Sequence, residues 1–173
     1  MRRPAINDAN RRWWILGAAS AGIAMAMLDE TVVAVALDTI RDDLGMSQIA
    51  SHWIVNAYLL TLAAFVALGG RIADIIGRRT IFLVGIVVFV AASACSGASH
   101  IFESGEMLIA ARAAQGLGAA MMIPSSQAIV TSAFPVSQRG TAMGVYAGIS
   151  VAFLALGPLL GGVLTEHVGW EWV

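Results

Sequence analysis

Five long apolar stretches, separated by short polar links, run along this chain. They cover residues 13–37, 53–72, 81–98, 107–134 and 141–164. A helix that crosses a lipid bilayer needs about 20 mostly apolar residues, so the pattern predicts five membrane-spanning helices. Because the links are short, consecutive helices should be antiparallel neighbours. We therefore expect an all-α integral membrane bundle at residues 13–173, preceded by a polar N-terminal segment at residues 1–12.

The amino-acid composition agrees with a membrane protein and argues against several other classes. Of the 173 residues, 58% are hydrophobic and only 12% are charged, whereas soluble domains carry about 25% charged residues. The net charge of −1 favours no nucleic acid or anionic surface as a partner. Cys95 is the only cysteine, so no disulfide can form within the chain. We find no nucleophile constellation, phosphate-binding loop or metal-ligand spacing, and expect membrane lipid as a partner but no enzymatic activity, cofactor or metal.

The first apolar stretch has some features of a cleaved signal peptide. Arg11 and Arg12 precede it, and the small residues "AMA" at 24–26 resemble a cleavage site. However, apolar residues resume at Thr31 and continue to Leu37, and four more stretches follow. We therefore expect this stretch to remain in the protein as its first transmembrane helix.

Positive charge is unevenly distributed over the links. If the helices alternate in direction, one side of the membrane carries eight arginines: Arg2, Arg3, Arg11, Arg12, Arg71, Arg78, Arg79 and Arg139. The other side carries Arg41 with seven acidic residues: Asp38, Asp42, Asp43, Glu103, Glu106, Glu166 and Glu171. Links rich in arginine face the cytoplasm. The sequence thus predicts a multi-pass protein of the cell (inner) membrane with a cytoplasmic N-terminus, and with Trp170 and Trp172 in the outer interfacial belt.

The link between the second and third stretches has a charge pattern that topology alone does not require. Asp74 lies near the C-terminal end of a predicted helix, where the helix dipole disfavours a negative charge. We expect it to pair with Arg78 one turn further on, with Arg79, or with a neighbouring helix N-terminus. Gly70 and Gly77 leave room for such close approach.

Four stretches resemble motifs of the major facilitator superfamily, in the expected order. The sequence "GRIADIIGRRTIF" (70–82) resembles the signature loop of that family. "LDETVVAVALD" (28–38), "LIAARAAQGLGAA" (108–120) and "GPLLGG" (157–162) resemble the first-, fourth- and fifth-helix motifs of its fourteen-helix multidrug antiporter branch. The chain departs from these patterns at Asp38, Ile75, Phe153 and Glu171. The resemblance implies a helix bundle built from inverted repeats, with drug:proton antiport as its activity.

Two ionisable residues lie deep within apolar stretches, where charge is costly and therefore indicates a functional site. Asp29 is the seventeenth residue of the first stretch, about 24 Å along a helix. Arg112 lies about 8 Å into the fourth stretch, which enters from the opposite side, so the two should be at similar depth. The resemblance implies that both take part in proton coupling or substrate binding, with Asp29 carrying the proton. The alternative is a structural ion pair that sets the helix register.

Further residues are candidates for the same cavity. Glu30 lies about 100° around the helix from Asp29 and either contacts a cationic substrate or faces the polar loops. Gln115 shares the face of Arg112 and should hydrogen-bond within the bundle. Asn56 and Tyr58 lie near the outer end of the second stretch and either line the cavity or, for Tyr58, anchor the interface.

Two further groups are expected to serve gating and helix packing. The resemblance implies a cytoplasmic gating loop composed of Gly70, Asp74, Gly77, Arg78 and Arg79. Small residues recur at every fourth position from Gly140 to Ala152, which provides a ridge for close helix contact. The helix-packing antiporter motif comprises Gly144, Gly157, Pro158, Gly161 and Gly162, and the proline bends or loosens the helix.

The leading interpretation is the N-terminal part of a proton-coupled transporter, specifically a multidrug efflux antiporter. The resemblance implies protons and small amphipathic compounds, cationic ones included, as its partners. The family's fold needs more helices than this chain supplies, so we expect a missing C-terminal half or another chain to complete it. The alternative is a truncated, non-transporting membrane protein, or an interaction module that needs another chain.

Overall fold

The structure, a computed structural model, describes residues 8–172. Five long α-helices and two short 3-10 helices make up this part of the chain: α1 Asp8–Asp43, α2 Gln48–Ile76, α3 Arg78–Ala98, α4 Gly105–Ala133, η1 Val136–Gln138, α5 Arg139–His167 and η2 Trp170–Trp172. Residues 1–7, with Arg2 and Arg3 of the predicted N-terminal segment, and residue Val173 lie outside the described residues.

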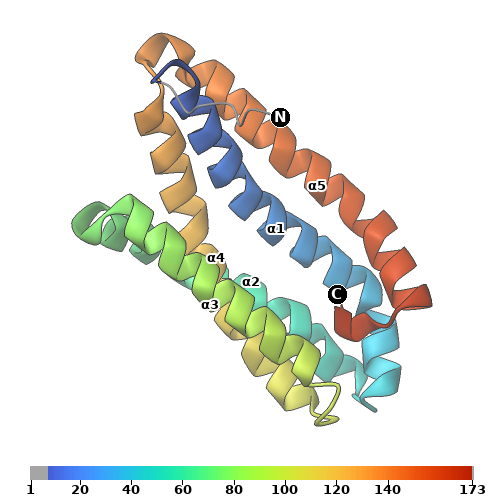
Figure 1. Ribbon diagram of the computed structural model, residues 1–173. Helices are drawn as coiled ribbons and strands as arrows, with labels where there is room; N and C mark the ends of the chain where they lie inside the picture. Colours follow the sequence, from blue (N-terminus) through green and yellow to red (C-terminus); the bar gives the residue numbers. More distant parts are fainter. Residues whose placement is uncertain (1–7, 173) are drawn as a thin grey trace.

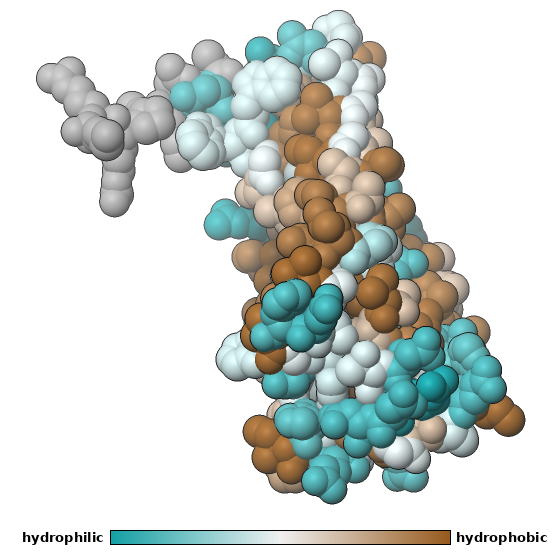
Figure 2. Space-filling view, turned by 90° about the vertical axis from the view of Figure 1, so that its right-hand side faces the viewer, coloured by the Kyte–Doolittle hydropathy of each residue, from teal (hydrophilic) through white to brown (hydrophobic). Residues whose placement is uncertain are grey.

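The predicted all-α membrane architecture is confirmed. All five helices are long and apolar enough to cross a membrane. Large hydrophobic side chains such as Val87 and Leu159 are more than half exposed. Figure 2 shows apolar side chains gathered over the middle of the molecule and hydrophilic ones at its lower end. An apolar surface of this extent is unfavourable in water and suits contact with lipid.

The helices extend beyond the apolar stretches because caps, rather than hydropathy, end them. Helix α1 continues through the mostly polar residues 38–43. It stops before Gly45, whose φ of 59° is a left-handed conformation that glycine adopts readily. Ser47 starts α2 by accepting a backbone hydrogen bond with its side chain, and Ser104 starts α4 in the same way.

Helix α4 is the central element of the bundle. It packs against α2 and α3 and also against α1, while α5 packs mainly on α1. Figure 1 shows α1 and α5 side by side, with α2 and α3 grouped on the other side of the bundle. Consecutive helices run in opposite directions, as the short links predicted.

Glycines of α4 allow this close packing. A Cβ atom on Gly116 would overlap the carbonyl oxygen of Tyr58 in α2. A Cβ atom on Gly118 would lie 2.8 Å from the backbone nitrogen of Phe89 in α3. Any larger residue at these positions would therefore force α2 or α3 away from α4, together with the polar groups that they carry.

The C-terminal half of α5 packs on α1 through two glycines of the predicted antiporter motif. Gly157 and Gly161 are buried. Added Cβ atoms at these positions would meet Thr31 and Val32 of α1, respectively. The glycines thus let the two helices approach at backbone distance.

The glycines in the N-terminal half of α5 are not packed against another helix of the described residues. Gly140, Gly144 and Gly148 are exposed and have open space where a side chain would be. We call these three residues the α5 ridge. Pro158 is exposed and Gly162 also has open space around it, although both belong to the predicted packing motif. Within residues 8–172, the α5 ridge has no helix packed against it.

The bundle has an arginine-rich end and an acidic end. The arginine-rich end holds the start of α1, the α2–α3 turn and the α4–α5 link, and the acidic end holds the remaining links. At the acidic end, Asp43 accepts a hydrogen bond from Trp170 Nε1 at 2.8 Å and lies 3.1 Å from His100 Nδ1. Trp170 is buried, so its prediction as an interfacial residue is wrong: its ring packs in the core and its N–H is paired. Trp172 is exposed.

Candidate functional site

Asp29 of α1 and Arg112 of α4 form an ion pair inside the bundle. Arg112 Nη1 and Asp29 Oδ2 are 2.5 Å apart, and the two side chains are only 2% and 10% exposed. The similar depth predicted for the two residues is thus confirmed. Removing both charges from water is costly, so their attraction and additional hydrogen bonds must offset that cost.

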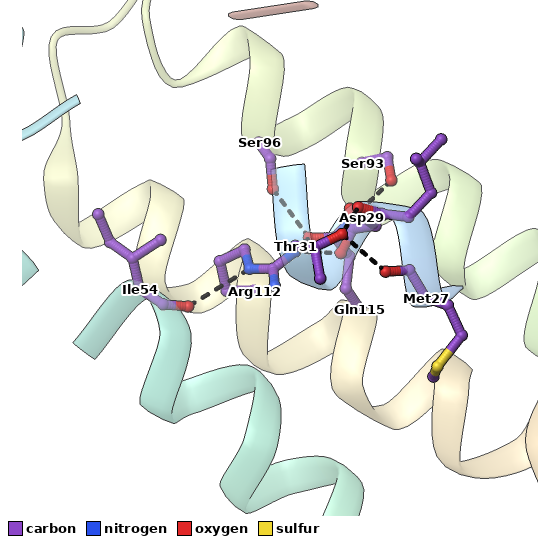
Figure 3. A network of polar contacts seen from close by, with 9 residues as sticks. Met27, Asp29, Thr31, Ile54, Ser93, Ser96, Arg112 and Gln115 are labelled. Carbon is purple, nitrogen blue, oxygen red and sulfur yellow. Dashed lines mark hydrogen bonds and ion pairs between the residues drawn. The ribbon is translucent and has the colours of Figure 1, made fainter. Parts of the chain in front are cut away.

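Helix α2 holds the other side of the arginine. Arg112 Nε donates to the carbonyl oxygen of Ile54 at 3.3 Å, and the guanidinium carbon lies 4.5 Å from the centre of the Tyr58 ring. A cation over a buried aromatic face is attracted by the negative π-cloud. The guanidinium is therefore held between α1 and α2, as Figure 3 shows for its contacts with Asp29 and Ile54.

Gln115, one turn after Arg112, joins the pair to a third helix. Its Nε2 atom donates to Asp29 Oδ1 at 2.9 Å and to Ser93 Oγ at 2.6 Å. Its Oε1 atom accepts from Arg112 Nη1 at 2.8 Å and from Ser96 Oγ at 3.3 Å. The amide thus connects α1, α3 and α4 around one carboxylate (Figure 3). We call Asp29, Arg112, Gln115, Ser93 and Ser96 the carboxylate cluster.

The two serines of α3 were not among the residues predicted from the sequence. The sequence holds one signal for them, since Ser93 and Ser96 are three residues apart and therefore share one face in an apolar part of the helix. Serine in a transmembrane helix is also common, because its hydroxyl can bond the backbone one turn earlier. The spacing alone therefore did not distinguish these residues from ordinary ones.

The other predicted cavity residues lie in different surroundings. Tyr58 is fully buried with its ring against Arg112, so it does not anchor the interface, and it is not among the residues that line the cavity beside Asp29. Asn56 is exposed on α2 and lies outside the carboxylate cluster. Glu30 is half-buried on α1, next to Asp29 in the sequence.

A cavity of about 510 Å³ adjoins the carboxylate cluster. Asp29, Arg112, Gln115 and both serines line it, and towards the acidic end it is bordered by residues such as Trp170. A carboxylate beside such a cavity can exchange a proton with water while a fixed cation stands next to it. In the described part of the chain, no group of three or more His, Cys, Asp or Glu side chains is placed to hold a metal ion.

The predicted gating loop forms its expected ion pair. Arg78 Nη2 lies 3.2 Å from Asp74 Oδ1, and Arg78 Nη1 also donates to the carbonyl oxygen of Ala128 in α4 at 3.3 Å. Gly77 separates α2 from α3 with a φ of 122°, which side chains rarely allow. The loop thus links α2, α3 and α4 at the arginine-rich end.

The other two residues of the loop differ in their surroundings. A Cβ atom on Gly70 would lie 3.3 Å from Pro124 of α4, so this glycine serves close packing. Arg79 is exposed.

Several known proteins are similar to this chain in sequence. The profile of the Major Facilitator Superfamily matches residues 19–173. A puromycin resistance protein of Streptomyces alboniger is 42% identical over 163 residues, 94% of this chain and 32% of that protein. A tetracenomycin C resistance and export protein of Streptomyces glaucescens is 39% identical over 168 residues, which are 97% of this chain and 31% of that protein. Multidrug resistance protein 3 of Bacillus subtilis (strain 168) is 34% identical over 152 residues, which are 88% of this chain and 29% of that protein. The chain spans about a third of the length of these relatives.

Proposed function

Because the chain belongs to the major facilitator superfamily, we propose that it is the N-terminal part of a proton-coupled efflux antiporter for small amphipathic compounds. The family is one of membrane transporters, which sets the chain apart from enzymes. Relatives named for drug resistance or export support outward transport of such compounds. The order of the four motifs supports an N-terminal position.

One observation carries the proposal: a carboxylate and a guanidinium are buried together in the apolar interior. Asp29 and Arg112 are 10% and 2% exposed and joined by a 2.5 Å contact. An apolar pair of similar volume would hold two helices together at lower cost in desolvation. Ionisable residues within a membrane are usually kept for proton or substrate pathways. The pair therefore supports proton coupling over a purely structural role.

The proposed proton step uses only these side chains. In the ionised state Asp29 neutralises Arg112 and attracts it, which favours contact between α1 and α4. A proton taken up from water neutralises the carboxylate, so Arg112 loses its counter-ion and this attraction weakens. Release of the proton on the other side of the membrane restores the pair. Binding and release thereby link a proton gradient to movement of the helices.

Charge supports the proposed orientation. With arginine-rich links in the cytoplasm, the N-terminus is cytoplasmic and the acidic end faces outward. The cavity beside Asp29 is bordered by acidic-end residues such as Trp170, so this arrangement admits protons from outside. The proposed location is the cell membrane. We assign to Glu30, half-buried and one residue from Asp29, the contact with cationic groups of substrates.

The α5 ridge supports a partner that completes the transporter. Its three glycines are exposed, with open space where side chains would lie. Small residues on a transmembrane helix favour close packing of another helix. We propose that helices of a second half, or of another chain, pack here and supply the surface against which this bundle moves.

Efflux of a fluorescent lipophilic cation from proteoliposomes tests the proposal. The full-length gene product is assayed with and without a proton gradient. Asp29→Asn should abolish gradient-driven efflux, because the amide cannot carry the proton. Asp38→Asn is the matched control: this carboxylate lies on the same helix but is 87% exposed. It should leave efflux unchanged.

The two possible failures have different meanings. Wild-type efflux by Asp29→Asn would remove Asp29 from the proton pathway and overturn the coupling mechanism. Absence of gradient-driven efflux from well-inserted wild-type protein would instead favour the non-transporting alternative, an interaction module that binds another bundle through the α5 ridge.

A further inference from the structure

We infer that Ser93 of α3 is a positioning residue for Asp29 and acts on it through the side-chain amide of Gln115. The inference rests on the proposed function of Asp29 as the proton carrier. It adds a third helix, α3, to the elements that control this carboxylate. The geometry around the amide leads to this assignment in three steps (Figure 3).

First, every hydrogen-bonding position of the Gln115 amide is occupied. A primary amide has two N–H donors and two lone pairs on oxygen. The donors go to Asp29 at 2.9 Å and to Ser93 at 2.6 Å, and the lone pairs accept from Arg112 at 2.8 Å and from Ser96 at 3.3 Å. Gln115 is buried, so the amide is a fixed group between two charges.

Second, the two charges determine which way the amide faces. A rotation by 180° would place its oxygen against the Asp29 carboxylate and its N–H groups against the Arg112 guanidinium. Both contacts would be repulsive, because a carboxylate only accepts and a guanidinium only donates. The observed orientation therefore matches ionised Asp29. If Oδ1 of Asp29 takes up a proton, it becomes a donor and no longer fits the N–H of Gln115.

Third, Ser93 holds the atom that contacts the carboxylate. Its Oγ accepts from Gln115 Nε2, the same nitrogen that donates to Asp29. Without this hydroxyl, one N–H of a buried amide loses its acceptor, so Nε2 is positioned by Asp29 alone and the contact with the carboxylate weakens. Ser96 cannot substitute, since it is bonded to the oxygen side of the amide at the longer distance of 3.3 Å.

Loss of the Ser93 hydroxyl should change how efflux depends on the external proton concentration. The Gln115 N–H stabilises Asp29 only as a carboxylate, so a weaker contact makes proton binding more favourable. One hydrogen bond to a charged group accounts for about a tenfold change in an equilibrium constant. Ser93→Ala weakens this bond without removing it, so it should lower the half-saturating external proton concentration by up to about tenfold. It should also reduce the maximal efflux rate, because proton release is slower.

The experiment measures initial rates of gradient-driven efflux from proteoliposomes that contain the full-length gene product, at fixed internal pH and graded external pH. Ser93→Cys keeps a similar volume but is a weak acceptor, so it should shift the proton dependence as Ser93→Ala does. Ser93→Thr keeps the hydroxyl and should retain wild-type behaviour. Ser99→Ala is the control: its hydroxyl lies on the same helix, is buried and donates to the backbone of Ser96 at 2.6 Å.

Each outcome decides a separate point. A shift in the Ala and Cys variants that is absent from the Thr and Ser99 variants supports the inference. Wild-type proton dependence in Ser93→Ala or Ser93→Cys, with or without a lower maximal rate, overturns it and leaves Ser93 a packing residue. If Asp29→Asn itself retains wild-type efflux, the proposed function has failed instead, and this result is recognised independently of Ser93.

Discussion

At the scale of single residues, Arg112 meets requirements that lysine could not. Its guanidinium reaches Asp29, Gln115 and the Ile54 carbonyl oxygen while its flat face lies over the Tyr58 ring. Arginine presents five N–H donors in a planar fork, whereas a lysine ammonium is a compact charge with no flat face. The contacts with α1, with α2 and within its own helix α4 thus depend on the shape of the arginine as well as its charge.

Loss of Arg112 should destabilise the protein strongly. In Arg112→Ala, Asp29 would remain buried without its counter-ion, which costs about 3–5 kcal/mol. The double variant Asp29→Asn/Arg112→Gln removes both charges and should recover most of that loss. The melting temperatures of the single and double variants, measured by thermal denaturation in detergent, check this prediction. Equal melting temperatures for the single and double variants would contradict a role for the buried charge.

Tyr58 offers a separate prediction, because its ring and its hydroxyl have different surroundings. The ring faces Arg112, while the hydroxyl is buried and has no hydrogen-bond partner among residues 8–172. Tyr58→Phe keeps the ring and removes an unpaired polar group, so stability should be unchanged or slightly higher. Tyr58→Leu loses the cation–π contact and should lower stability by about 1–3 kcal/mol. A large loss in Tyr58→Phe, measured by thermal denaturation, would show that the hydroxyl is bonded.

At the scale of elements, helix α5 uses its glycines in two ways. Gly157 and Gly161 are buried against α1, where the backbones come close together. The α5 ridge is exposed, and we propose that it receives another bundle. In this proposal, one helix has one surface for its own bundle and another for a partner.

A matched pair of valine substitutions tests the buried surface. A Cβ atom on Gly161 would lie 3.0 Å from the Cα atom of Val32, and backbone cannot move aside as a flexible side chain can. Gly162, the next residue, has open space. Gly161→Val should therefore cost about 1–3 kcal/mol through overpacking, while Gly162→Val should cost little. Comparable melting temperatures for the two variants would argue against close packing of α5 on α1.

At the scale of the whole molecule, the two ends of the bundle face opposite sides of the membrane in the proposal. The arginine-rich end has the Asp74–Arg78 pair bonded to α4, and it faces the cytoplasm in the proposed orientation. The acidic end has Asp43 bonded to Trp170, which ties the end of α1 to η2. Proton entry from the acidic end then requires that this end face outward.

Cysteine labelling in intact cells tests this orientation. Val136 at the arginine-rich end and Phe102 at the acidic end are 78% and 67% exposed. With Cys95, the single cysteine of the 173 residues, replaced by serine, a membrane-impermeant maleimide should label Phe102→Cys but not Val136→Cys. Both should be labelled once the cells are opened. The reverse pattern in intact cells would invert the proposed topology.

Much of this fold could be predicted from the sequence, because the membrane imposes it. Lipid requires about 20 apolar residues per spanning helix, so hydropathy alone revealed all five helices. Ions are costly in that environment, so Asp29 and Arg112 stood out, and their positions along antiparallel helices predicted that they would lie at similar depth. The Asp74–Arg78 pair followed from a spacing of one helical turn. The helix ends were predicted less well, since serine caps and Gly45 determine them.

Contacts between helices were decided only by the tertiary structure. The place of Ser93 beside Gln115, the burial of Trp170 and the exposure of the α5 ridge all depend on how each helix is rotated about its axis. In a soluble helix, an apolar stripe predicts that rotation. In a membrane helix the lipid-facing and buried sides are both apolar, so the pattern carries little information about rotation. Close packing of small residues and a few buried hydrogen bonds set it instead, and these depend on several helices at once.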